Sequence, residues 1–152
     1  MLKWGDLFTA RQKLGLVTLG GTIRHSTNRQ AVMEFAGLAV SRLTDIFNAQ
    51  GVWETTKTQV RNLFSRQALS LRWDFAEASA FGGQAGDYLT TFETMVRVVE
   101  RLASFGKSAH VQPADTSEHP LPDETTHIWF TDPPYYDAIP YADLSDFFLV
   151  WL

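Results

Sequence analysis

The chain has 152 residues and a formal net charge of −4, with 45% hydrophobic residues, 20% charged residues and no cysteine. This composition is typical of a folded globular protein and argues against a disordered one. It excludes disulfides, cysteine-based zinc sites and thiol catalysis, and it fits a cytoplasmic protein. The four histidines lack metal-ligand spacing, and no apolar run is long enough to cross a membrane.

The charge is unevenly divided along the chain. Residues 1–72 contain ten Lys and Arg against four Asp and Glu, a net charge of +6. Residues 73–152 contain three against thirteen, a net charge of −10. A basic half could mark a surface that faces phosphate groups. Two solvated helical faces would leave the same pattern, so both interpretations stay open.

The first predicted helix begins with a capping-box pattern. Thr9 and Gln12 have the spacing of this motif, and the helix should run to about Ile23. Gly20 and Gly21 weaken its end. Its apolar positions include Leu14, Val17 and Leu19.

A second helix is predicted at about 29–50, with Asn28 as its N-cap and Gly51 at its end. Apolar residues recur there with the 3.6-residue period of a helix face. The members of this stripe are Val32, Phe35, Ala36, Ala39, Leu43, Ile46 and Phe47.

The middle of the chain has a mixed pattern. Residues 68–75 could form a short strand, and residues 80–87, AFGGQAGD, should form a loop. A third helix is predicted at about 88–104 and should end at Gly106. Its predicted buried face consists of Phe92, Met95, Val96, Val99 and Leu102.

The last third of the sequence indicates the order helix, strand, loop, strand, sharp turn and helix. The predicted strands are SAHVQPAD at 108–115 and THIWF at 126–130, separated by a polar loop. A helix with Asp143 or Ser145 as its cap should follow the turn. This alternation favours an α/β fold with a parallel sheet.

A stiff aromatic corner, DPPY at 132–135, follows the second predicted strand. Asp132 precedes a proline, which pushes it towards extended backbone. Pro133 and Pro134 have a fixed φ and no N–H, so their carbonyl oxygens need donors from elsewhere. An ionised Asp132 only accepts hydrogen bonds, and Tyr135 adds a flat aromatic face.

Such a corner suits a planar guest with an exocyclic amino group, such as adenine, cytosine or a carboxamide. This amine is a poor nucleophile because its lone pair is delocalised. Two fixed acceptors on its hydrogens would favour a pyramidal nitrogen that can attack an electrophile. Ligands of open α/β sheets bind beyond the carboxyl ends of strands, where this corner would lie.

The run DPPY after an apolar strand resembles the catalytic motif of amino-methyltransferases that use S-adenosylmethionine. The longer run at 131–152, TDPPYYDAIPYADLSDFFLVWL, resembles one branch, the large bacterial and archaeal adenine-specific DNA methylases. Residues 4–12, WGDLFTARQ, and 64–77, FSRQALSLRWDFAE, are similar to other parts of that branch. The resemblance covers most of the chain.

The resemblance implies an α/β protein with a partial Rossmann-like class I methyltransferase fold. Residues 1–86 would form a helical region and residues 87–152 a partial catalytic region. The implied activity is methyl transfer from S-adenosylmethionine to the amino group of adenine in DNA. In the family the acidic residue and the adjacent carbonyl bind the amine and the aromatic residue stacks on the flipped base, which assigns these roles to Asp132, Pro133, Pro134 and Tyr135. Asp115 would approach the adenine of the cofactor.

Other side chains near the corner allow two interpretations. Asp137, Asp143 and Asp146 could be extra acceptors, although such carboxylates are more typical of loops and helix N-termini. Tyr136 and Tyr141 could line a pocket or pack against the protein.

The glycine-rich run at 81–86 stands too close to DPPY for the strands that a complete methyltransferase fold places between them. We therefore expect it to be an ordinary loop, with the cofactor loop upstream of these residues. We also expect a fragment whose apolar last helix is exposed, which is inactive alone and binds S-adenosylmethionine weakly or not at all. A non-catalytic α/β domain that binds a partner through basic helices stays open, as does an amino-methyltransferase for cytosine, RNA or a protein amide.

Overall fold

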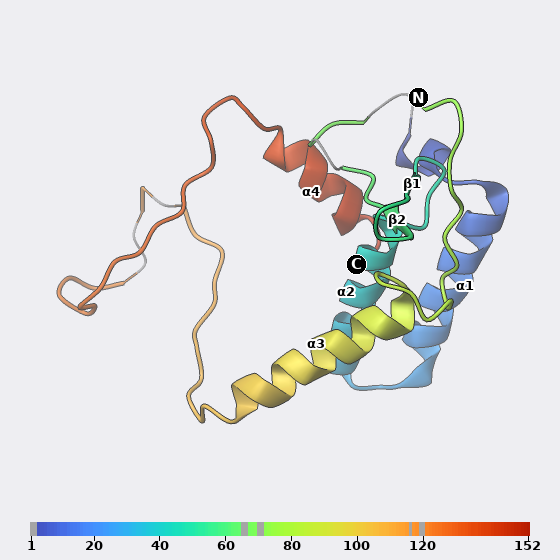
Figure 1. Cartoon of the computed structure of the whole chain (residues 1–152). Helices are drawn as coiled ribbons and strands as arrows, with labels where there is room; N and C mark the ends of the chain where they lie inside the picture. Colours follow the sequence, from blue (N-terminus) through green and yellow to red (C-terminus); the bar gives the residue numbers. More distant parts are fainter. Residues whose placement is uncertain (1–2, 65–66, 70–71, 116, 119–120) are drawn as a thin grey trace.

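The structure is a computed structural model, and it describes residues 3–64, 67–69, 72–115, 117–118 and 121–152. Helices and one short hairpin cluster together, and a long loop extends away from them between α3 and α4 (Figure 1). The elements are η1 (Trp4–Leu7), α1 (Ala10–Ser26), α2 (Gln30–Thr44), β1 (Val52–Glu54), β2 (Gln59–Arg61), α3 (Tyr88–Ala103) and α4 (Tyr141–Leu149). No helix in these ranges is both long and apolar enough to cross a membrane.

The capping box of α1 is confirmed. The Gln12 N–H donates to Thr9 Oγ1 at 3.2 Å, and the Thr9 N–H donates to Gln12 Oε1 at 2.9 Å. These two bonds satisfy two N–H groups that a helix start leaves without partners. The helix continues past Ile23 to Ser26. Leu16 is its buried apolar residue, whereas the predicted positions Leu14 and Val17 are exposed.

Helix α2 is buried along much of its length and ends earlier than predicted. It starts after Arg29 rather than Asn28, without a side-chain cap, and it stops at Thr44 instead of continuing to Gln50. The Asn48 side chain donates to the Thr44 carbonyl at 2.9 Å, and the Ala49 N–H donates to the Leu7 carbonyl at 2.8 Å. These partners replace the next helical hydrogen bonds, so contacts with η1 help to end the helix.

Strands β1 and β2 form an antiparallel hairpin that the sequence analysis did not predict. Trp53 pairs with Val60 across it, and the turn between the strands ends at Thr58, whose φ is +49°. Beyond β2, the Leu63 N–H donates to the Asp45 backbone carbonyl at 2.8 Å. This bond attaches the hairpin to the end of α2.

The core is centred on Phe147 of α4, which is fully buried. Its ring meets the Trp4 ring edge-on, with centroids 5.6 Å apart, and stacks against the Phe8 ring at 6.0 Å. The ring of Phe64 meets it edge-on at 5.1 Å. The last predicted helix is therefore only partly exposed, because Phe147 is buried while Leu149 and Leu152 face solvent.

Helix α3 contacts α2 but buries none of its own residues completely. The Phe35 and Phe92 rings meet edge-on at 5.6 Å, and they join the two helices near the start of α3. The predicted buried face is thus wrong in its second half, because Val99 and Leu102 are 51% and 60% exposed. The end of the helix is as predicted, since Gly106 has a φ of +64°, which favours glycine.

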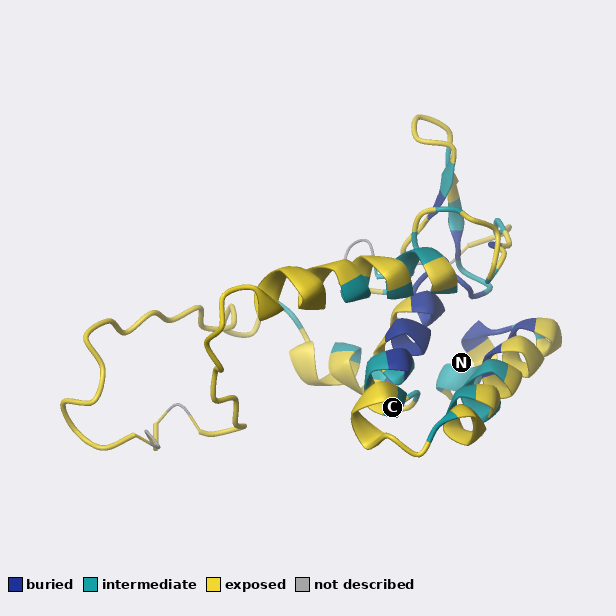
Figure 2. Cartoon of the chain, turned by 90° about the horizontal axis from the view of Figure 1, so that it is seen from below, coloured by how far each residue is buried: buried dark blue, intermediate teal, exposed yellow. Residues whose placement is uncertain are grey.

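The segment between α3 and α4 contains no helix or strand among its described residues. It is exposed almost throughout (Figure 2). The strands predicted at 108–115 and 126–130 are therefore not formed, and neither is the one at 68–75, of which residues 70–71 lie outside the description. An apolar run becomes a strand only when a neighbour pairs with its backbone, and none of the described residues does so here. The methyltransferase fold class stays a prediction.

Replacing Phe147 with Ala should lower the free energy of unfolding by about 3–5 kcal/mol, because the change removes a buried ring and leaves a cavity. Urea titration followed by tryptophan fluorescence measures the loss. Leu149→Ala on the same helix is the control, since Leu149 is exposed, and it should change stability by no more than about 0.5 kcal/mol. Equal losses in the two variants would contradict a core centred on Phe147.

Candidate functional site

The corner at 132–135 lies on the surface in non-helical backbone, as predicted from its prolines. Asp132 accepts no hydrogen bond from the described residues and is exposed. Tyr135 is 71% exposed. The carboxylate and the aromatic side chain are thus both accessible to a ligand, although no strand precedes them among the residues described.

Helix α4 anchors this corner to the folded part of the chain. The Tyr135 N–H donates to the Tyr141 hydroxyl oxygen at 3.4 Å, and the Ala138 N–H donates back to the Tyr135 carbonyl at the same distance. Asp137 lies between them with a φ of +53°, which turns the chain towards α4. Because Tyr141 is the first residue of the helix that buries Phe147, the corner connects directly to the core.

The tyrosines that the sequence left ambiguous differ in their roles. Tyr136 is 99% exposed, whereas Tyr141 bonds the corner through its hydroxyl group. Asp143 lies in the first turn of α4, where a carboxylate favours the helix dipole. The sequence did not decide the role of Tyr141, because a spacing of six residues from Tyr135 does not by itself indicate a contact.

Asp115 lies in the exposed segment and bonds only locally. Its carboxylate accepts from the Ser117 N–H at 2.8 Å and from the Ser117 hydroxyl at 2.7 Å. These bonds lower the pKa of Asp115 below the ordinary aspartate value. The carboxylate is committed to its own loop, and its proposed approach to cofactor adenine stays a prediction.

The loop at 81–86 is fixed by the carboxylate of Asp87, which is buried and caps α3. Oδ1 of Asp87 accepts from the Thr90 N–H at 2.8 Å, and Oδ2 accepts from the Gly83 N–H at 2.6 Å. Burial alone would raise the pKa of Asp87, but hydrogen bonds from Thr90, Gly83 and Gln84 outweigh it and lower the pKa.

The described residues do not fit a complete S-adenosylmethionine site. Asp87 takes the Gly83 N–H that a cofactor loop would offer to its ligand. The cavity beside this loop is lined by Arg42 and Arg61, whose positive charges oppose a sulfonium ion. The part of the chain that the structure describes also brings together no group of three residues that could hold a metal ion.

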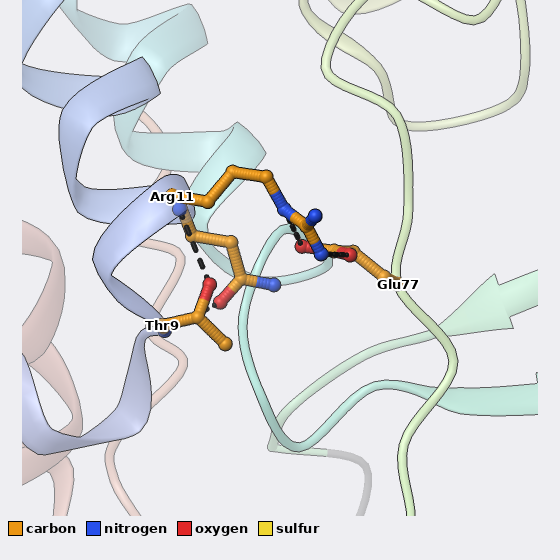
Figure 3. Close-up of polar contacts among 4 residues, drawn as sticks. Thr9, Arg11 and Glu77 are labelled. Carbon is orange, nitrogen blue, oxygen red and sulfur yellow. Dashed lines mark hydrogen bonds and ion pairs between the residues drawn. The ribbon is translucent and has the colours of Figure 1, made fainter.

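The three segments that carry the sequence resemblance converge in space. Trp4 and Phe8 come from the first, Phe64 from the second, and Phe147 with Trp151 from the third, and their rings pack together. An ion pair between Arg11 and Glu77 joins the first two segments again (Figure 3). One aromatic cluster therefore contains residues from all three segments.

Comparison with known proteins adds no relative. No family model matches the chain, and no match was found among curated proteins or solved structures.

Tyr141→Phe should leave the fold intact but release the Tyr135 N–H, because the substitution deletes only the hydroxyl acceptor. We expect amide hydrogen exchange at Tyr135 to accelerate about threefold, since a long, exposed hydrogen bond contributes little. Tyr136→Phe is the matched control and should leave that rate unchanged. Unchanged exchange in Tyr141→Phe would remove the link between the corner and α4.

Asp87→Asn should lower the free energy of unfolding by about 1 kcal/mol at neutral pH, because an NH₂ group replaces one of the two carboxylate oxygens that accept hydrogen bonds. The lowered pKa fixes the sign of the pH dependence. The contribution of the carboxylate is complete above the unfolded-state pKa, near 3.8, and is lost as the pH falls through the folded-state pKa. The stability difference between the two proteins should therefore be complete above about pH 4 and should shrink progressively as the pH falls further. Asp115→Asn should leave the global stability unchanged, and a gap that persists or widens in acid would contradict this role of Asp87.

Proposed function

We propose that this chain carries the amine-binding part of an S-adenosylmethionine-dependent DNA methyltransferase that acts on adenine. The observation that carries the proposal is the accessible corner at 132–135, where a carboxylate that has no partner among the described residues precedes an exposed aromatic ring. The convergence of the three resembling segments on one core supports it.

The chemistry of the corner selects for an amino group on a planar ring. An ionised Asp132 offers only hydrogen-bond acceptors. The carbonyl oxygens of Pro133 and Pro134 are further acceptors, and neither proline has an N–H that could donate. Tyr135 provides a face on which a base can stack. Adenine combines a flat ring with an amine, and a base must leave the duplex before it can make these contacts.

The proposal assigns the amine side of the reaction to this chain. Since the described residues do not fit a complete cofactor site, their role is to bind and orient the base. The basic first half of the chain, with its net charge of +6 in residues 1–72, would attract the DNA backbone.

Base binding can be tested with two single-stranded DNA oligonucleotides that differ in one base, adenine or the same purine without its amino group. Fluorescence anisotropy gives both affinities. The unaltered protein should prefer adenine, and Asp132→Ala should abolish this preference because the acceptor for the amine is gone. Tyr135→Ala should weaken binding of both DNAs about tenfold, as expected for a lost stacking contact.

Tyr136→Ala is the matched control, because its side chain is 99% exposed and adjacent in sequence. It should leave both affinities unchanged. A preference for cytosine, RNA or a carboxamide would redirect the proposal to that substrate. Affinities that are unchanged in Asp132→Ala and Tyr135→Ala but depend on the basic residues of α1 and α2 would instead support a non-catalytic partner-binding domain.

A further inference from the structure

A second candidate site lies away from the corner, between the end of α2, strand β2 and the loop at 81–86. It is a cavity of about 410 Å³, within the range of small-ligand sites. Its lining includes Arg42, Arg61 and Asn62. Among the described residues, the charged members of this lining are the two arginines, and no acidic residue belongs to it.

Both arginines are held in place by carboxylates that lie outside the lining. Arg42 Nη1 donates to Asp45 Oδ2 at 2.6 Å, and Arg61 Nη1 donates to Glu54 Oε2 at 3.2 Å. Each pair uses one terminal nitrogen of its guanidinium group. The other nitrogens, Nε and Nη2, make no hydrogen bond to the residues that the structure describes.

The carboxylates are themselves engaged with protein donors. Asp45 is buried, and its second oxygen accepts from the Leu63 N–H at 3.1 Å. Glu54 Oε2 also accepts from the Gln59 side chain at 2.8 Å. The hydrogen bond from Gln59 lowers the pKa of Glu54, and the charges of Arg61 and Lys57 lower it further. Together they outweigh desolvation, so Glu54 stays ionised at neutral pH. Each of the two arginines therefore has a carboxylate partner before any ligand arrives.

Gly86 forms another part of the cavity wall. Gly86 has a φ of +86°, and a Cβ at this position would come within 3.1 Å of Ile46 Cδ1. Its backbone therefore lies close to Ile46, just beyond the end of α2, where a side chain would cause crowding. Phe64 contributes an apolar wall on the same cavity.

We propose that this cavity binds a phosphate group between Arg42 and Arg61. A guanidinium presents parallel N–H donors that match phosphate oxygens, and a pre-positioned guanidinium loses less entropy on binding. Both arginines of the cavity also belong to residues 1–72, which have a net charge of +6. The phosphate could come from a nucleic-acid strand or from a small phosphorylated molecule, since the recognition chemistry is the same. The proposal does not depend on the function of the corner.

The test titrates the isotope-labelled chain with two probes and follows its backbone and arginine NMR signals. Inorganic phosphate represents the free ligand, and a single-stranded oligothymidine represents the strand. Thymine offers no exocyclic amino group to Asp132, and the titrations are repeated with Tyr135→Ala to remove stacking at the corner from the binding signal. We expect saturable shifts at Gly86 and at the side chains of Arg42 and Arg61.

Arg61→Gln should weaken binding about tenfold, as expected for lost charge-assisted hydrogen bonds. Arg61→Lys keeps the positive charge but loses the paired N–H donors of the guanidinium group, so it should also weaken binding. Arg24→Gln is the matched control, because it removes the same charge from an exposed position on α1. Saturation by phosphate alone supports a small phosphorylated ligand, and saturation by oligothymidine alone supports a strand. Absence of saturation with both probes, or equal weakening by Arg24→Gln and Arg61→Gln, would overturn the proposal.

Discussion

Burial of the Phe147 ring is the interaction on which the rest of this structure depends. Helix α4 has nine residues, which is too short to be stable alone in water. Its packing against Trp4, Phe8 and Phe64 supplies the missing stabilisation and joins parts of the chain that are far apart in sequence. Aromatic pairs with this geometry contribute about 0.5–1.5 kcal/mol each beyond their buried area. The start of the chain and the last helix therefore depend on each other for their conformation.

The sequence predicts best those elements whose ends are set by local chemistry. The capping box of Thr9 and Gln12 and the glycine at 106 both lie where predicted, because each acts within a few residues. Helix α2 ends early because the Thr44 carbonyl accepts from the Asn48 side chain and the Ala49 N–H donates to the Leu7 carbonyl. The contact with Leu7 is remote in sequence, so it leaves no periodic signal there. The apolar run at 126–130 satisfies the strand pattern but has no described partner strand.

In the candidate site, too, some features could be predicted from the sequence and others depend on the fold. The non-helical backbone of the corner follows from the prolines and could be predicted, whereas the bond from Tyr135 to Tyr141 depends on the turn at Asp137. The cavity with Arg42 and Arg61 had no sequence signal beyond the excess of basic residues. Arg42 and Arg61 line the same cavity because the hairpin attaches to the end of α2 through Leu63 and Asp45.

The two sites achieve rigidity by different physical means. At the corner, the proline rings restrict the backbone covalently, so the acceptors keep their arrangement although little of the folded protein surrounds them. In the cavity, flexible arginine side chains are held by carboxylates whose other contacts are to the protein. Covalent restraint suits an exposed segment, because it requires no buried partner and leaves no N–H group unsatisfied. Ion pairing suits the cavity, because it fixes each guanidinium while leaving most of its donors available to a ligand.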